Sequence, residues 1–280
     1  MTIREALRTA AERLELHRVS NARLTGEVLL AHVLAVSREY LHGHDDRILT
    51  SDESDRLETV IYDRVSGVPL QYVVGRQEFY GRYFHVNPSV LIPRPETEFI
   101  IEAVLENRGQ TPFCRILDVG TGSGCIGVTL ALEIPEAVVI ASDISEEAVR
   151  VARENARRLN ATVQFVCMDL MDGISGLFDF IVSNPPYVAH GELNRLQREV
   201  RDHEPHVALF GGLEIYRRLI REAAACLCPG GYLIMEIGFK MEEAILKLFG
   251  EEWEHLPTKT DLQGIPRTIL AKYSRGISMR

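Results

Sequence analysis

The sequence lacks an apolar run long enough to cross a membrane, and residues 1–7 form an amphipathic segment instead of the continuous apolar stretch of a signal peptide. We therefore expect a cytoplasmic protein without membrane contact. The five cysteines are an odd number and include no CxxC pair, which favours reduced, mostly buried thiols and no metal site. Basic residues also do not outnumber acidic residues.

The charge balance is acidic, with 31 Lys and Arg residues against 40 Asp and Glu residues and a formal net charge of −9. A protein that holds long nucleic acid through its phosphates needs a basic surface, so no stable nucleic-acid binding is expected. With 280 residues, of which 46% are hydrophobic and 25% charged, the chain has room for one full α/β domain and a smaller one.

Residues 1–74 have the pattern of a small helical bundle. Apolar residues recur at helical spacing, a second apolar helix is expected over residues 22–36 after the candidate caps Ser20 and Asn21, and Thr50 with Glu53 has the spacing of a capping box. A helical domain of this kind commonly recognises a macromolecular partner, and a purely structural role is the alternative. Residues 75–92 are rich in aromatic residues and glycine, which predicts a β-hairpin linker.

Residues 93–280 predict a second domain in which strands and helices alternate. Pro95 and the acidic residues after it predict a helix start, and strands are expected at 116–119, 138–141, 163–167, 178–183, 232–237 and around 268–270, with helices at 214–227 and 241–249. Alternation on this scale implies a parallel sheet that is covered by helices on both faces.

The first of these strands leads into a glycine-rich loop, Gly120-Thr121-Gly122-Ser123-Gly124, and then into a helix. This order lets a ligand approach the backbone closely at the helix N-terminus. The run Gly122-x-Gly124-x-x-Gly127 formally matches a dinucleotide fingerprint, but a carboxylate beside the loop, Asp118, would repel a pyrophosphate.

Asp118 suits a cationic cofactor with a free ammonium group, and S-adenosylmethionine carries such a group. The pattern Asp118-x-Gly120-x-Gly122-x-Gly124 is the one seen in Rossmann-like methyltransferases. Asp143, at the tip of the second strand, is placed to accept hydrogen bonds from both ribose hydroxyls, and a nucleobase is expected at Asp169 and Leu170. Alternatively, Asp118 caps local amides at the end of its strand.

The tetrapeptide Asn184-Pro185-Pro186-Tyr187 follows the buried strand at 178–183, where ligands bind in open α/β sheets. The prolines remove two backbone donors and leave stiff carbonyl acceptors. Asn184 and this backbone can hold a planar NH2 group by its two hydrogens, with Tyr187 against its flat face. The alternative is that Asn-Pro-Pro only forms a turn.

Five stretches of the sequence together resemble the HemK/PrmC family, the peptide chain release factor glutamine methyltransferases. These stretches are Ile92-Pro-Arg-Pro-Glu-Thr-Glu98, Asp118-Val-Gly-Thr-Gly-Ser-Gly124, Ser183-Asn-Pro-Pro-Tyr187, Glu199-Val-Arg-Asp-His-Glu-Pro205 with Ala208-Leu-Phe-Gly-Gly212, and Asp261-Leu-Gln-Gly264-Ile-Pro-Arg267. The resemblance covers nearly the whole chain. One departure is that Leu213 directly follows Gly212, where the family usually has a short Pro-Asp-Gly-like insertion.

The resemblance implies a Rossmann-like class I methyltransferase sheet (93–280) behind a helical substrate-recognition domain and a β-hairpin linker. The implied reaction moves a methyl group from S-adenosylmethionine to the amide nitrogen of the glutamine in the Gly-Gly-Gln motif of class 1 release factors. Asn184, Pro185, Pro186 and Tyr187 would form the catalytic site, and Asn184 would also contact the cofactor. An adenine-N6 methyltransferase acting on DNA or RNA is the runner-up, and a non-catalytic module that binds a release factor or the ribosome is the third hypothesis.

Overall fold

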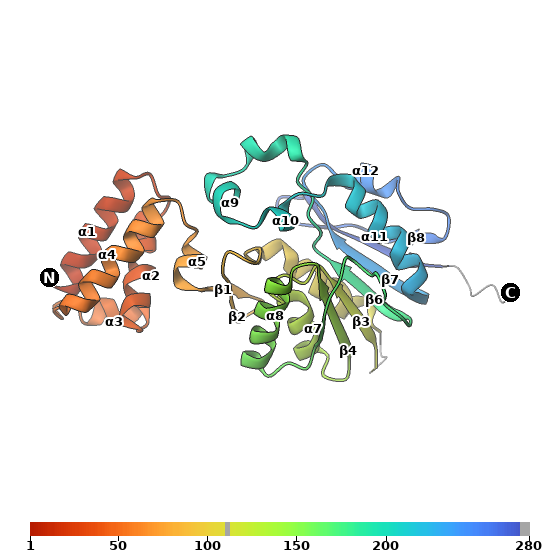
Figure 1. Cartoon of the computed structure of the whole chain (residues 1–280), viewed down its shortest axis with the longest axis horizontal. Helices are drawn as coiled ribbons and strands as arrows, with labels where there is room; N and C mark the ends of the chain where they lie inside the picture. Colours follow the sequence, from red (N-terminus) through yellow and green to blue (C-terminus); the bar gives the residue numbers. More distant parts are fainter. Residues whose placement is uncertain (110–112, 275–280) are drawn as a thin grey trace. The chain divides into compact units, whose positions relative to one another are not determined.

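The computed structural model describes residues 1–109 and 113–274 of the chain (Figure 1). Contacts divide the chain into two compact units. The first, here the helical unit, contains Met1–Arg76 and the distant segment Gln197–His203; the second, here the sheet unit, contains Gln77–Leu196 and the chain from Glu204 onward. The domain boundaries expected after residues 74 and 92 stay predictions.

The helical unit is built from six helices of its described residues: α1 (Ile3–Leu16), α2 (Ala22–Leu34), α3 (Arg38–Gly43), α4 (Ser51–Val65), α5 (Leu70–Val74) and α9 (Arg198–His203). Its core contains buried residues such as Ile3, Leu14, Leu30, Leu57 and Ile61. Capping boxes start α1 at Thr2 and α4 at Thr50, the second as predicted. Local hydrogen bonds at these starts fix where each helix begins.

Helix α9 is separated from the rest of the helical unit by more than a hundred residues, yet it is bonded to the end of α4. The buried guanidinium of Arg64 pairs with the Glu199 carboxylate, and Arg198 Nη2 donates to the carbonyl of Ser66 at 3.1 Å. The chain therefore passes between the units three times, after Arg76, Leu196 and His203.

The sheet unit is built on one mixed sheet with the strand order β5-β4-β3-β6-β7-β10-β8. The strands are β3 (Arg115–Val119), β4 (Val138–Asp143), β5 (Gln164–Cys167), β6 (Phe178–Ser183), β7 (Leu227–Glu236), β8 (Trp253–His255), β9 (Lys259–Thr260), which pairs with β10, and β10 (Pro266–Tyr273). The first five in the order are parallel, and β10 runs antiparallel to β7. A separate hairpin joins β1 (Arg76–Phe79) to β2 (Arg82–His85), as predicted for residues 75–92.

Helices cover both faces of this sheet and bury two apolar cores. One core contains residues of α6 (Glu98–Asn107), α7 (Cys125–Glu133) and α8 (Glu146–Leu159), and the other contains residues of α11 (Gly212–Cys226) and α12 (Glu242–Leu246). The remaining elements are η1 (Pro95–Thr97), η2 (His190–Arg195) and α10 (His206–Leu209). The α/β fold class is confirmed, and the carboxyl ends of β3, β4 and β6 meet at one edge.

The structure corrects several local predictions. Asn21 precedes α2 in the left-handed region without a side-chain cap, and residues 90–92 lie outside any strand. Strand β7 begins at Leu227, five residues before the predicted start, because Leu227 pairs with Phe178 and an irregularity in the register accommodates Pro229 to Gly231. The final strand is antiparallel, so the sheet is mixed.

No helix in the two described ranges has the length and apolarity to span a membrane.

Candidate active site at the carboxyl ends of the strands

The glycine loop after β3 is held by the neighbouring strand β4. The amides of Gly120 and Thr121 both donate to the Ser142 carbonyl at 2.8 Å. Gly120 and Gly122 have φ values of 72° and 55°, which disfavour side chains, and no atom lies within 4 Å of the place where either residue would carry a Cβ. The loop therefore presents an open strip of backbone at this edge of the sheet.

Asp118 lies beneath the loop and is fully buried. Its Oδ2 accepts from Thr121 Oγ1 at 2.6 Å and from the Gly127 amide at 2.9 Å, whereas Oδ1 makes no hydrogen bond within the described structure. Burial raises the pKa of this carboxyl to about 7. Asp118 does not line the cavity described below. This position agrees with the alternative role of Asp118, in which its carboxylate caps local amides. Its role toward a cofactor ammonium stays a prediction.

Asp143 ends β4 and does line the cavity. Its two oxygens accept from the amides of Gly122 and Ser145, both at 2.9 Å, which fixes the plane of the carboxylate. Each oxygen keeps a further lone pair for another donor. Burial raises the pKa of Asp143, opposed by these backbone hydrogen bonds.

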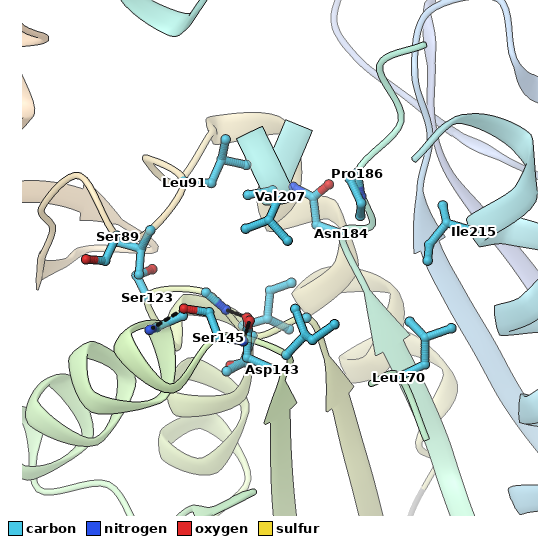
Figure 2. A pocket seen from close by; sticks show the side chains of 18 of the residues that line it. Ser89, Leu91, Ser123, Asp143, Ser145, Leu170, Asn184, Pro186, Val207 and Ile215 are labelled. Atoms are coloured by element: carbon cyan, nitrogen blue, oxygen red, sulfur yellow. Dashed lines mark hydrogen bonds between the residues drawn. The ribbon is translucent and has the colours of Figure 1, made fainter. Parts of the chain in front are cut away.

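Asn184 directly follows β6 and places its amide at the same edge (Figure 2). Its Nδ2 donates to Thr97 Oγ1 at 3.1 Å. Pro186 lines the cavity, whereas Pro185 is buried and outside the lining. The Tyr187 ring packs against the backbone of Gly238, also outside the lining, and burial raises its pKa to about 12.

The tetrapeptide is braced from behind by the segment before α11. Val188 donates its amide to the Leu209 carbonyl at 2.9 Å, and the Gly211 amide donates back to the Val188 carbonyl at 3.3 Å. Gly211 lies so close that a Cβ there would overlap the Pro186 carbonyl oxygen. The departure from the family pattern, after Gly212, therefore lies next to the segment that supports Pro186.

These groups surround one cavity of about 290 Å³ in the sheet unit (Figure 2). Of the predicted residues, it is lined by Gly120, Thr121, Gly122, Ser123, Asp143, Asp169, Leu170, Asn184 and Pro186, while Asp118, Gly124, Pro185 and Tyr187 lie outside the lining. Gly124 instead packs its backbone against Ala152 of α8. The volume is at the lower end of the usual range for small-molecule sites.

The cavity wall also contains residues that the sequence did not single out. They come from η1 and the segment before it, from α10 and the residue after it, and from α11: Ser89, Val90, Leu91, Pro93, Thr97, Val207, Phe210, Ile215 and Arg218. Arg218 Nη2 bonds Asp169 Oδ2 at 3.0 Å, which ties the end of β5 to α11. The Ile92–Glu98 motif contained Pro93 and Thr97, and the Ala208–Gly212 motif contained Phe210, whereas the others carry no local signature.

Two polar residues of the family motifs have structural partners here. Arg94 pairs with the buried carboxylate of Glu204, which also accepts from the Ile92 amide at 3.2 Å. These bonds fix the segment that leads into η1. Among the described residues, no group of three or more His, Cys, Asp or Glu side chains is arranged to hold a metal ion.

Comparison with known proteins identifies both parts of the chain. Residues 5–75 match the model of the PrmC N-terminal domain, and residues 95–256 match that of the methyltransferase small domain. A crystal structure of a methyltransferase from Pyrococcus furiosus shares the fold, with a TM-score of 0.52 at 21% identity over 79% of this chain and all of that one.

Two relatives are similar over nearly their whole length. The release factor glutamine methyltransferase of Koribacter versatilis is 45% identical over 97% of this chain and 99% of its own, and that of Nitratidesulfovibrio vulgaris is 41% identical over 97% and 95%. With both domain models matched and this identity along the full chain, the protein belongs to the HemK/PrmC family of release factor glutamine methyltransferases.

Proposed function

We propose that the protein transfers a methyl group from S-adenosylmethionine to the side-chain amide nitrogen of the glutamine in the Gly-Gly-Gln motif of class 1 peptide chain release factors, and so supports translation termination. The observation that carries this proposal is the Asn184 amide, which lines the same cavity as the glycine loop and Asp143. Family membership supports the same reaction. Such a substrate would place the reaction in the cytoplasm.

The residues of the cavity fit S-adenosylmethionine. The open backbone of Gly120 and Gly122 leaves room for close approach, and the fixed carboxylate of Asp143 has lone pairs for the ribose hydroxyls. Asp169 and Leu170 line the part of the wall where the adenine is expected. When it is ionised, Asp118 adds negative potential beneath the loop, which suits a cationic cofactor better than a pyrophosphate. When bound, this cofactor supplies an activated methyl group.

The chain's own contribution is to hold the acceptor amide. An amide nitrogen is a poor nucleophile because its lone pair is delocalised into the carbonyl. Asn184 Oδ1 and the Pro185 carbonyl would accept one N–H each, turn the lone pair toward the methyl group and stabilise the positive charge that develops on nitrogen. Holding the reacting atoms in line contributes about 7 to 11 kcal/mol in well-oriented systems.

No strong base is required, because the N-methylated amide cation is acidic enough to lose its proton to water. Tyr187, with a pKa of about 12, is neutral at pH 7 and would offer its ring to the flat face of the amide. In the same proposal, the helical unit recognises the release factor.

Transfer of labelled methyl from S-adenosylmethionine to a purified class 1 release factor tests the proposal. We expect label on the wild-type factor and none on a factor whose Gly-Gly-Gln glutamine is replaced. Asn184→Ala should lower turnover by roughly a hundredfold or more while still binding the cofactor, measured by calorimetry. Label on a DNA control alone would support the adenine-N6 alternative, and label on neither would reject transfer to both.

A further inference from the structure

Two buried residues form a hydrogen-bonded chain behind Asn184. Asn184 Nδ2 donates to Thr97 Oγ1 at 3.1 Å, and Thr97 Oγ1 donates to Glu236 Oε2 at 2.6 Å. Thr97 is 1% exposed and Glu236 is 3% exposed. Thr97 lines the cavity, whereas Glu236 does not. The chain of hydrogen bonds therefore runs from the cavity wall into the interior of the sheet unit.

The donor and acceptor roles along this chain follow from chemistry. Thr97 spends its single hydroxyl hydrogen on Glu236 Oε2, as it must whenever that carboxyl is ionised and can only accept hydrogen bonds. The Thr97 oxygen can then only accept from Asn184, which requires the NH2 of the Asn184 amide on that side. The amide oxygen of Asn184 is thereby turned away from Thr97.

Glu236 is itself held in place. It ends β7 opposite Thr268 of β10, and its carbonyl accepts from the buried Tyr216 hydroxyl at 2.9 Å. Burial of Glu236 and the negative charge of Glu96 favour its protonated acid, whereas the positive charges of Arg267 and Arg94 favour its carboxylate. The strand pairing and the Tyr216 bond therefore fix the backbone of Glu236, from which its carboxyl reaches Thr97.

We propose that Thr97 and Glu236 are positioning residues that fix the Asn184 amide with its oxygen toward the methyl acceptor. This inference rests on the proposed transfer to a primary amide. With the opposite orientation, the NH2 group of Asn184 would face the N–H bonds of the acceptor, and two donors cannot bond each other. A single reversed amide would remove the acceptor that the reaction uses.

A purely structural role would have a different signature. The chain connects η1, β6 and β7, so its loss could simply loosen the fold. In that case stability would fall, and the effect on turnover would not depend on the presence of Asn184. A positioning role predicts that the effect on turnover vanishes once Asn184 is gone.

The test is a double-mutant cycle in which single-turnover methyl transfer to the release factor is measured for Thr97→Val, Asn184→Ala and the double variant. Thr97→Val should lower the rate about tenfold to a hundredfold, with little change in KM for the release factor or in cofactor affinity. In the Asn184→Ala background the same substitution should have little further effect. Thr97→Ser, which keeps the hydroxyl, should restore most of the rate.

Thr268→Val is the matched control, because Thr268 is also fully buried and its hydroxyl makes no hydrogen bond within the described part of the chain. It should retain the wild-type rate. If Thr97→Val does not fold, Glu236→Gln takes its place in the cycle; Gln accepts from Thr97 in only one of its two orientations, so a smaller loss is expected.

The outcomes separate the two proposals. Equal losses for the tested substitution with and without Asn184, or a folded variant with the wild-type rate, would overturn the positioning role and leave the proposed function standing. A wild-type protein that transfers no methyl to the release factor would overturn the proposed function, and this inference with it.

Discussion

Gly211 has no room for a side chain, because its backbone lies against the Pro186 carbonyl. Gly211→Ala should displace Pro186 and its neighbours, since backbone atoms cannot move aside as a flexible side chain can. We expect turnover to fall by roughly tenfold or more, as when active-site groups are misplaced by about an ångström. Steady-state kinetics with the release factor would measure the loss.

Gly191→Ala is the control for this substitution, because nothing lies within 4 Å of the place of a Cβ at Gly191. It should leave kcat unchanged. An unchanged kcat in Gly211→Ala as well would show that the position of Pro186 does not matter to the reaction.

Glu236 should make the stability of the fold depend on pH. Burial raises its pKa from 4.5 to about 7, so the folded state binds its proton more tightly than the unfolded state does. This contribution to stability is present below pH 4.5 and is lost as the pH rises through 7. Between pH 5 and pH 8 the free energy of unfolding of the wild type should fall by on the order of 2 kcal/mol relative to that of Glu236→Gln, whose side chain does not titrate.

Urea unfolding of both proteins at the two pH values would measure this difference. Asp118, whose pKa is also about 7, is present in both proteins and cancels in the comparison. Parallel stability curves for the two proteins would contradict the assignment of the titration to Glu236.

At the residue scale, the sequence predicted groups whose chemistry is local and missed those whose role depends on distant partners. Asp143 and Asn184 follow strands directly, so their place at the sheet edge could be predicted from the strand pattern. Glu236 follows an apolar stretch of β7, and only the packing of Thr97 against it gives it a partner. The position of Asp118 outside the cavity wall likewise depends on how the loop closes over it.

At the scale of elements, Asn155 of α8 connects the hairpin with the glycine loop. Its side chain bonds the backbone N–H and C=O of His85 at 2.7 and 2.9 Å and the Ser123 carbonyl at 2.8 Å. Asn155→Ala would remove all three bonds from a site that is 1% exposed. We expect a loss of about 3 kcal/mol in the free energy of unfolding, because buried backbone groups lose their partner.

Urea denaturation would measure that loss. Glu154→Ala, at the adjacent exposed position of α8, is the control and should change stability little. If Asn155→Ala were as stable as the wild type, other groups would have to replace the lost hydrogen bonds.

The main strands and helices of the sheet unit were predictable because each combines an apolar run with a clear start or stop. Strands β8 and β9 are short and gain their partners only from β10, so their own residues gave no strand pattern. Helix α9 was missed because it contains no buried residue and depends on bonds to α4. The antiparallel direction of β10 is likewise a property of the connection and not of the strand.

At the scale of the whole molecule, Arg64 holds α9 in the helical unit. Arg64→Met keeps the apolar stem and removes the pair with Glu199. If the pair contributes about 1 to 2 kcal/mol, α9 should open roughly fivefold to thirtyfold more often. Limited trypsin digestion, followed by mass spectrometry, should show faster cleavage after Arg198 and Arg201.

Arg56→Met is the control on the same helix, because the Arg56 pair with Asp52 is largely exposed. It should leave the cleavage rates after Arg198 and Arg201 unchanged. Equal rates in wild type and Arg64→Met would show that α9 does not depend on this pair.

The return of the chain to the helical unit at Gln197–His203 limits how the two units can be exchanged between relatives. A unit that is joined by a single linker can be replaced as one continuous cassette. Here a chimaera that takes only residues 1–76 from another protein would separate Arg64 from the Glu199 with which it is matched. Recombination that keeps the Arg64–Glu199 pair has to transfer both residues 1–76 and Gln197–His203. We therefore expect the two units to be inherited together.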